Sequence, residues 1–173
     1  LKTSTARWDV LGNSVMISPM RFATIAGNDK ANEAIGYIRE RSTGIAVNSD
    51  QWDGYTAERD RLLTVLDEQG SNALFLTGDI HSEWANSISA TYGEIGCEMV
   101  TTSISAPNVD EILTSAFGTY HPEDNSTSLL VEKVIRDNNP WVNHIDFDAH
   151  GYGVASIHHD FVDMLYYRVS DVE

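Results

Sequence analysis

The chain has 173 residues, 42% of them hydrophobic, so it is long enough to bury one sizeable core, and its length predicts a single domain. Its 11 basic and 26 acidic residues give a net charge of -15, which repels phosphodiester backbones and argues against a nucleic-acid scaffold as partner. The single cysteine, Cys97, excludes an internal disulfide. No apolar run approaches the ~18 residues that cross a bilayer, so we expect no transmembrane segment.

The first half of the chain alternates short apolar runs with polar stretches. Residues 15–17 are apolar and precede a proline, which predicts a buried strand, and a short helix is expected around 32–41. In 56–70, leucines recur at helical spacing and a glycine follows, so this segment predicts a helix. Only a short turn separates it from 73–77, a continuous apolar run typical of a strand covered on both faces. The pair predicts a layered α/β fold.

The second half continues the alternation of strands and helices. Residues 98–105 are rich in Val, Ile and Thr and predict a strand that a proline ends. Helices are expected at 110–117 and 129–138, the latter amphipathic and followed by a proline. The tail, 151–169, is rich in β-branched and aromatic residues and predicts two strands joined by a turn at His159 and Asp160.

Asp79 and His81 follow the predicted strand 73–77 directly, in the sequence GDIHS. Ligands of α/β sheets bind beyond the carboxyl ends of the strands, and a carboxylate with an imidazole suits a cation such as Ca, Mg, Mn, Fe or Zn. The alternative is structural: Asp79 caps a following turn at SEWAN, and His81 is a satisfied, partly buried histidine. Both interpretations remain open on the residues alone.

A second stretch, 48–63, places Trp52, Asp53 and Tyr55 immediately before the predicted helix. Two aromatic residues and a carboxylate are costly on a featureless surface, so we expect this stretch to line a cleft. The alternative is that Trp52 and Tyr55 pack on the sheet edge while Asp53 caps the helix.

Two motifs together carry a family resemblance. The sequences QWDGYTAERDRLL at 51–63 and LFLTGDIHSEWAN at 74–86 resemble the C-terminal part of PhoD-type alkaline phosphatases, which belong to the calcineurin-like metallophosphoesterases. Further stretches match in collinear order, namely 8–20, 100–108 and 139–157.

The resemblance implies an α/β fold: the C-terminal portion of a four-layer metallophosphoesterase-like sheet sandwich flanked by helices, with residues 1–173 as one part of that domain. It also implies a secreted, periplasmic or cell-surface hydrolase that cleaves phosphate mono- and diesters with iron and calcium, although Zn, Mn or Mg suit the same donors. Asp79 and His81 match the family's last metal-binding motif and are the expected catalytic and metal-binding residues. Trp52, Asp53, Tyr55, Ser82 and His150 are expected around them or along the cleft.

Several residues near the C-terminus are polar and alternate along 144–150. His144, Asp146, Asp148 and His150 offer a secondary cation site, or else the two aspartates face solvent while His150 supports the cleft. Both alternatives stand at this point.

The N-terminal ligand motifs of the family, of the Gly-Asp and Gly-Asn-His types, are not found in 1–70. Two ligands hold a metal weakly, so we expect the chain to be inactive by itself and to need the missing N-terminal part of the same domain as partner. The alternative function is a non-catalytic binding module that retains the scaffold without a complete metal site.

Overall fold

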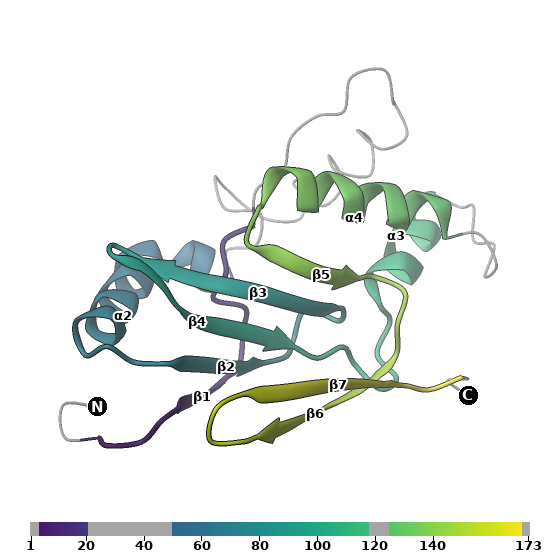
Figure 1. The fold of residues 1–173 in the computed structure, drawn as a ribbon. Helices are drawn as coiled ribbons and strands as arrows, with labels where there is room; N and C mark the ends of the chain where they lie inside the picture. Colours follow the sequence, from purple (N-terminus) through teal and green to yellow (C-terminus); the bar gives the residue numbers. More distant parts are fainter. Residues whose placement is uncertain (1–3, 21–49, 118–124, 171–173) are drawn as a thin grey trace.

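The computed structural model describes residues 4–20, 50–117 and 125–170. Its strands and helices follow one another in groups (Figure 1). In chain order they are β1 (Asp9–Asn13), the 3-10 helix η1 (Trp52–Gly54), α2 (Thr56–Glu68), β2 (Ala73–Thr77), β3 (Glu83–Ala90), β4 (Gly93–Val100), α3 (Val109–Phe117), α4 (Ser126–Asn138), β5 (Val142–Asp146), β6 (Gly151–Ile157) and β7 (Val162–Arg168).

Five strands form one mixed sheet in the order β1-β2-β4-β3-β5. β1, β2 and β4 are parallel, whereas β3 runs antiparallel to both of its neighbours, β4 and β5. The carboxyl ends of β1, β2, β4 and β5 therefore lie along one edge of the sheet, and the loops that follow them share that edge. This edge is called the carboxyl edge below.

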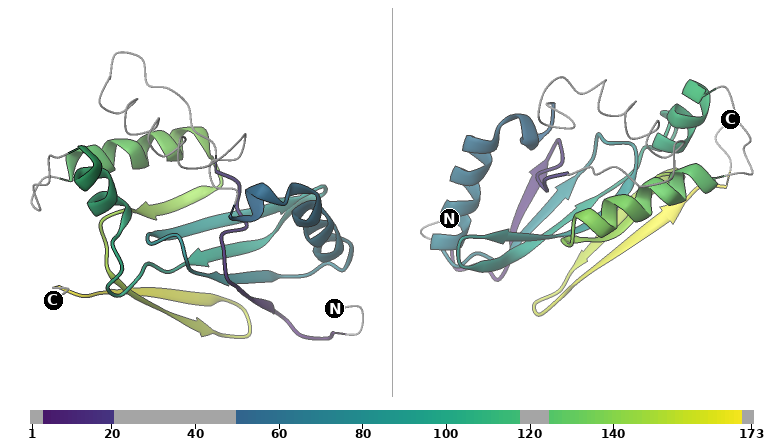
Figure 2. Two further views of the ribbon diagram at one scale, coloured as in Figure 1. Left: turned by 180° about the vertical axis from the view of Figure 1, so that it is seen from behind. Right: turned by 90° about the horizontal axis from the view of Figure 1, so that it is seen from above.

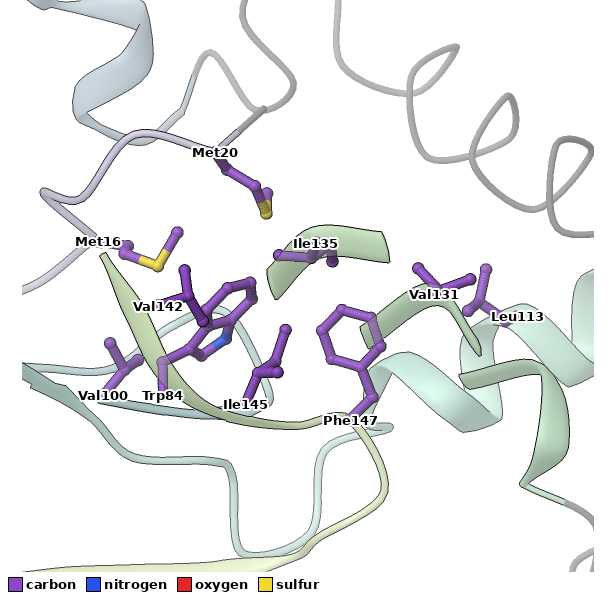
Figure 3. Close-up of a cluster of buried hydrophobic side chains, with 10 residues drawn as sticks. All are labelled: Met16, Met20, Trp84, Val100, Leu113, Val131, Ile135, Val142, Ile145 and Phe147. Carbon is purple, nitrogen blue, oxygen red and sulfur yellow. The ribbon is translucent and has the colours of Figure 1, made fainter. Parts of the chain in front are cut away.

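One face of the sheet is covered by helices and by the segment that follows β1. Around Trp84, the side chains of α3, α4, β4 and β5 join Met16 and Met20 in a buried cluster (Figure 3). Trp84 meets Phe147 edge to face, with 5.9 Å between the ring centroids. A second cluster packs Leu66 of α2 against Phe75 of β2. Burial of these large apolar side chains is the main driving force for the fold.

Glu98 is a fully buried carboxylate at the centre of the sheet. Its Oε1 accepts hydrogen bonds from the Ile17 backbone N–H at 2.8 Å and the Thr77 hydroxyl at 2.9 Å. Its Oε2 accepts from the Ser18 N–H at 3.0 Å and the Asn86 amide at 3.2 Å. Four donors compensate the lost hydration of this charge, so Glu98 attaches the segment after β1 to the sheet.

The opposite face of the sheet is covered by a two-stranded hairpin made of β6 and β7. In the view from above, α2 and this hairpin lie on opposite sides of the sheet (Figure 2). The Tyr166 hydroxyl donates to the Trp84 carbonyl at 2.6 Å, and its burial raises the pKa of Tyr166 far above the ordinary value. The hairpin's other face points outward and exposes Tyr152, Val154, Leu165 and Tyr167, which we call the outer stripe.

Most of the predicted elements are confirmed. The helices expected at 56–70, 110–117 and 129–138 are α2, α3 and α4, and the expected C-terminal hairpin is β6 and β7. The helix expected at 32–41 lies outside the described residues.

One expected strand is wrong, another is misplaced, and the turn considered at SEWAN is wrong. Residues 15–17 are not a strand, because the N–H groups of Ile17 and Ser18 bond to the Glu98 carboxylate rather than to a neighbouring strand. The strand expected at 98–105 is β4, which begins at Gly93 and leaves the sheet after Val100. The SEWAN stretch is not a turn, because it forms the start of β3. The buried side of β3 includes the polar Asn86, so the sequence of this strand does not show a clear alternation of apolar and polar residues.

Candidate metal centre at the carboxyl edge

The loop Gly78–Ser82 connects β2 to β3 at the carboxyl edge and carries Asp79 and His81. Both residues have left-handed backbone conformations, with φ of 71° and 55°, and they are the two non-glycine residues with positive φ in the described part of the chain. Such conformations cost about 1–3 kcal/mol each and are concentrated at functional sites. Aspartate and histidine tolerate them better than most residues.

Ile80 anchors the loop between Asp79 and His81. Its side chain packs against the Trp84 cluster, and its N–H bonds to the Gly78 carbonyl at 2.9 Å. The neighbouring Asp79 is exposed and His81 is half-buried. Ser82 is buried, accepts a hydrogen bond from the Trp84 indole at 2.8 Å and donates to the Ile80 carbonyl, so its contacts hold the loop in shape.

The His81 ring is oriented by a backbone carbonyl. Its Nδ1 lies 2.7 Å from the Pro107 oxygen. A carbonyl oxygen only accepts hydrogen bonds, so Nδ1 carries the proton and Nε2 keeps a free lone pair. This is the arrangement that metal-ligating histidines adopt, with one ring nitrogen hydrogen-bonded and the other available for the cation.

The loop that supplies Pro107 is held by Asn108, whose role the sequence analysis missed. Asn108 Oδ1 accepts from the Glu111 N–H at 2.8 Å, and Glu111 Oε2 accepts from the Asn108 N–H at 3.0 Å. This reciprocal pair is a capping box at the start of α3. The Asn108 amide also donates to the Asp148 carbonyl at 2.7 Å. The spacing Asn-x-x-Glu before an apolar helix was the available signal.

His150 lies behind this loop, close to Asn108. Its Nε2 is 3.2 Å from the Asn108 amide nitrogen and 3.4 Å from Glu111 Oε2, while its buried Nδ1 has no hydrogen-bond partner among the described residues. The structure thus connects His81 to His150 through Pro107 and Asn108. Whether His150 supports a cleft stays a prediction.

Trp52, Asp53 and Tyr55 lie at the same edge, beside the end of β1, and make different contacts. The Trp52 indole donates to Asn13 Oδ1 at 3.2 Å. Asp53 accepts from the Met20 N–H at 2.8 Å and pairs with Arg59, so both of its oxygens are engaged within the chain. Tyr55 is 60% exposed and lines a cavity with Trp52. Asp53 does not cap α2, because the N-cap residue is Tyr55.

His144 and Asp146 do not join Asp79 and His81, because they belong to a polar cluster on the hairpin side of the sheet. Arg168 of β7 bonds to Glu83 at 2.9 Å and to Asp146 at 2.7 Å, and His144 lies 3.4 Å from Glu83. Burial pushes the pKa of Glu83 upward, but the hydrogen bonds from His144 and Arg168 outweigh burial and hold this pKa below its ordinary value. Asp148 is exposed.

The donor set of the loop fits a cation only in part. Asp79 offers a hard oxygen and His81 a free imidazole nitrogen, a combination that suits Fe, Zn or Mn, with Ca or Mg at the carboxylate. Within the ranges that the structure describes, no three His, Cys, Asp or Glu residues are grouped so as to hold a metal ion. Additional ligands would be needed for tight binding.

The fold is α/β, and Asp79 and His81 lie at the carboxyl ends of its strands, where sheets of this class generally bind their ligands. The chain belongs to the PhoD-like phosphatase family, whose sequence model matches residues 1–166. It is 29% identical over 112 residues to alkaline phosphatase D of Bacillus subtilis (strain 168). The aligned residues cover 61% of this chain and 16% of that protein.

A solved structure described as "Structure of PhoD" matches 95% of this chain and 29% of its own chain, with a TM-score of 0.52 and 17% identity. This likeness concerns the fold, and it confirms the expected α/β fold in which a sheet is flanked by helices. The chain spans less than a third of the length of either relative. Among the helices that the structure describes, none has the length and apolar character needed to cross a membrane.

Proposed function

We propose that this chain supplies part of the active site of a metal-dependent phosphoesterase that cleaves phosphate mono- or diesters at alkaline pH. The observation that carries the proposal is the His81–Pro107 hydrogen bond, which commits Nδ1 and leaves Nε2 free, two residues after the exposed Asp79. Membership of a phosphatase family supports the reaction type. Asp79 and His81 would be the metal ligands, and through them the catalytic residues.

Iron and calcium are the proposed metals, in agreement with the family resemblance, and zinc, manganese or magnesium fit the same donors less specifically. A bound cation would supply an activated water and would offset negative charge that develops on the phosphoryl oxygens. Asp79 contributes an oxygen donor and His81 a nitrogen donor whose orientation is set by Pro107. A metal-held substrate also explains how a protein of charge -15 attracts a phosphate ester.

The remaining ligands are proposed to come from outside this chain. Two donors do not make a closed site, and the chain covers 16% of one relative and 29% of the other. We therefore assign residues 1–173 to the C-terminal part of a longer PhoD-like domain, exported to the periplasm, the cell surface or the medium. By itself the chain is expected to be inactive.

One observation favours a second candidate, a binding module without catalysis: the described residues contain no group of three metal donors. Metal analysis of the natural gene product separates the two functions. An enzyme is expected to hold stoichiometric iron or calcium, whereas the module is expected to hold none after dialysis.

The site assignment is tested in the natural gene product that contains this chain. Asp79→Asn and His81→Ala are expected to lower kcat/KM for an aryl phosphate by at least about 100-fold and to reduce the metal content, with an unchanged circular dichroism spectrum. Asp160→Asn and His159→Ala are the matched controls, because both residues are exposed in the β6–β7 turn. Full activity and normal metal content in either site variant would show that the assignment is wrong.

A further inference from the structure

A cavity of about 540 Å³ opens beside the end of β1, outside the Asp79–His81 loop. Asn13, Asp50, Trp52, Tyr55 and Glu58 are among the residues that line it. Its volume falls within the range of small-molecule pockets, about 300–1,000 Å³. The two aromatic residues come from the QWDGY motif, for which the metal site gives no explanation.

The lining of this cavity is aromatic and acidic. Trp52 and Tyr55 provide ring surface, Asp50 and Glu58 provide carboxylates, and no lysine or arginine occurs in the lining that the structure describes. The hydrogen bond from the Trp52 indole to Asn13 fixes the Trp52 ring. Aromatic faces near carboxylates attract organic cations, through the ring quadrupole and through charge.

Among the described residues, Arg59 and Arg61 do not reverse this charge. Arg59 is paired with Asp53, away from the cavity lining. Arg61 lies 3.2 Å from Glu58, but both side chains are largely exposed, at 79% and 62%, so water screens their interaction and the pair is weak. A phosphate group would be repelled from the cavity, whereas an ammonium group would be attracted.

The cavity is next to the proposed metal ligands. Asn13 pairs with Thr77 across β1 and β2, and its amide lies 3.5 Å from the Thr77 hydroxyl. Thr77 is the last residue of β2, two positions before Asp79. Strand spacing and rise per residue then place the wall of the cavity within about 10 Å of the Asp79 backbone. A phosphate ester bound at Asp79 and His81 would therefore reach the cavity with its alcohol part.

We propose that this cavity binds the alcohol part of the substrate and selects phosphate esters whose alcohol carries an organic cation, such as a quaternary ammonium group. The inference rests on the proposed phosphoesterase function and adds to it the class of substrate. Asp79 and His81 act at the phosphate end, while Trp52, Tyr55 and the two carboxylates recognise the cationic end.

The test compares two substrates of nearly identical shape in the natural gene product. Phosphocholine carries a trimethylammonium group, and 3,3-dimethylbutyl phosphate has a neutral carbon in place of the nitrogen. The ratio of their kcat/KM values is expected to favour phosphocholine by about 5–30-fold, from cation–π and charge attraction. Tyr55→Leu and Glu58→Gln are each expected to lower this ratio at least threefold. Tyr92→Leu and Glu94→Gln, exposed in the β3–β4 hairpin, are expected to leave it unchanged.

The outcomes separate the two proposals. Hydrolysis of both esters with equal kcat/KM would overturn the cation-binding cavity and leave the phosphoesterase function standing. If the gene product hydrolyses neither ester, the proposed function is contradicted. The cavity is then tested by titration with choline, followed through the NMR signals of Tyr55 and Trp52. Saturable shifts that Tyr55→Leu weakens would uphold the cavity, and absence of shifts at 50-fold excess would overturn it.

Discussion

At the scale of single residues, the loop after β2 stores backbone strain where the chemistry is proposed. Asp79 and His81 have left-handed backbone conformations. The packing of Ile80 and the hydrogen bond of the buried Ser82 hold these conformations in place. Strain of this kind persists only where the surroundings over-determine the conformation. A cation at the proposed site would therefore bind to a loop that is already ordered, which lowers the cost of binding.

Asn108 is predicted to set the position of His81 through Pro107. Asn108→Ala removes the N-cap of α3 and the bond to the Asp148 carbonyl, so we expect the free energy of unfolding to fall by about 1–3 kcal/mol. The His81 tautomer is also expected to lose its preference, because the Pro107 carbonyl is no longer held. Urea unfolding measures the first effect, and ¹⁵N chemical shifts of the His81 ring measure the second.

Asn125→Ala is the matched control for this prediction. Asn125 is likewise an N-cap residue, of α4, but its side chain makes no cap hydrogen bond. Its replacement is expected to change stability by less than about 0.5 kcal/mol and to leave the His81 ring signals in place. A retained Nδ1–H tautomer in Asn108→Ala would contradict the positioning role.

Sequence patterns predicted some of these residues and hid others for a physical reason. Asp79 and His81 were singled out as candidates because they follow an apolar strand directly, where ligand sites of α/β sheets lie. Glu98 was not found, because a charged residue inside a strand resembles an exposed position until its four donors are known. The donors come from residues 12 to 81 positions away in sequence, and no local pattern contains them.

At the scale of elements, one of the contacts that attach the β6–β7 hairpin to the sheet is made by a buried carboxylate. Glu83 is 1% exposed and bonds to Arg168 of the hairpin. Arg168→Met keeps the aliphatic stem but leaves Glu83 without its charged partner, so we expect a loss of about 2–3 kcal/mol in unfolding free energy at pH 7. Lys133→Met, which breaks the exposed pair with Asp137, is the control and should cost less than about 0.5 kcal/mol.

The pH dependence of this loss has a definite sign. The pKa of Glu83 is lowered in the folded protein, so its contribution is present above the ordinary carboxyl pKa and is lost as the pH falls through the lowered value. Arg168→Met removes a cause of that lowering. The difference in unfolding free energy between the unchanged protein and Arg168→Met should therefore shrink toward pH 3. Urea unfolding between pH 3 and pH 7 measures it. An equal difference at every pH would show that Arg168 acts through packing alone.

Elements with one dominant periodicity were the ones that the sequence predicted. In α2 the spacing of Leu62, Leu63 and Leu66 is unambiguous, and β2 is uninterrupted. The sequence did not predict β1 and β3 correctly, because contacts with distant parts of the chain determine where these strands lie. Residues 16–18 are as buried as a strand, but the N–H groups of Ile17 and Ser18 bond to Glu98. β3 buries Asn86 against the same carboxylate.

At the scale of the whole molecule, the layers are helices, sheet and hairpin, and the last layer has an uncovered apolar face. Tyr152 and Tyr167 of the outer stripe stack on one another, with 5.2 Å between the ring centroids, beside Val154 and Leu165. Four apolar side chains that are 40–51% exposed on paired strands form a contiguous surface rather than scattered residues. In the longer domain that we propose, residues outside this chain would cover the stripe.

This proposal predicts that one substitution has opposite effects in two contexts. Leu165→Ser is expected to raise the soluble concentration of the isolated chain, because it interrupts the outer stripe, and to lower the unfolding free energy of the natural gene product by about 1–3 kcal/mol, because it removes a buried contact. Tyr92→Ser, in an 84% exposed position, is expected to change neither quantity. Sedimentation of the isolated chain and urea unfolding of the gene product measure the two effects. If Leu165→Ser leaves the stability of the gene product unchanged, the stripe stays exposed there, and the hairpin is then an outer surface of the protein rather than an internal layer.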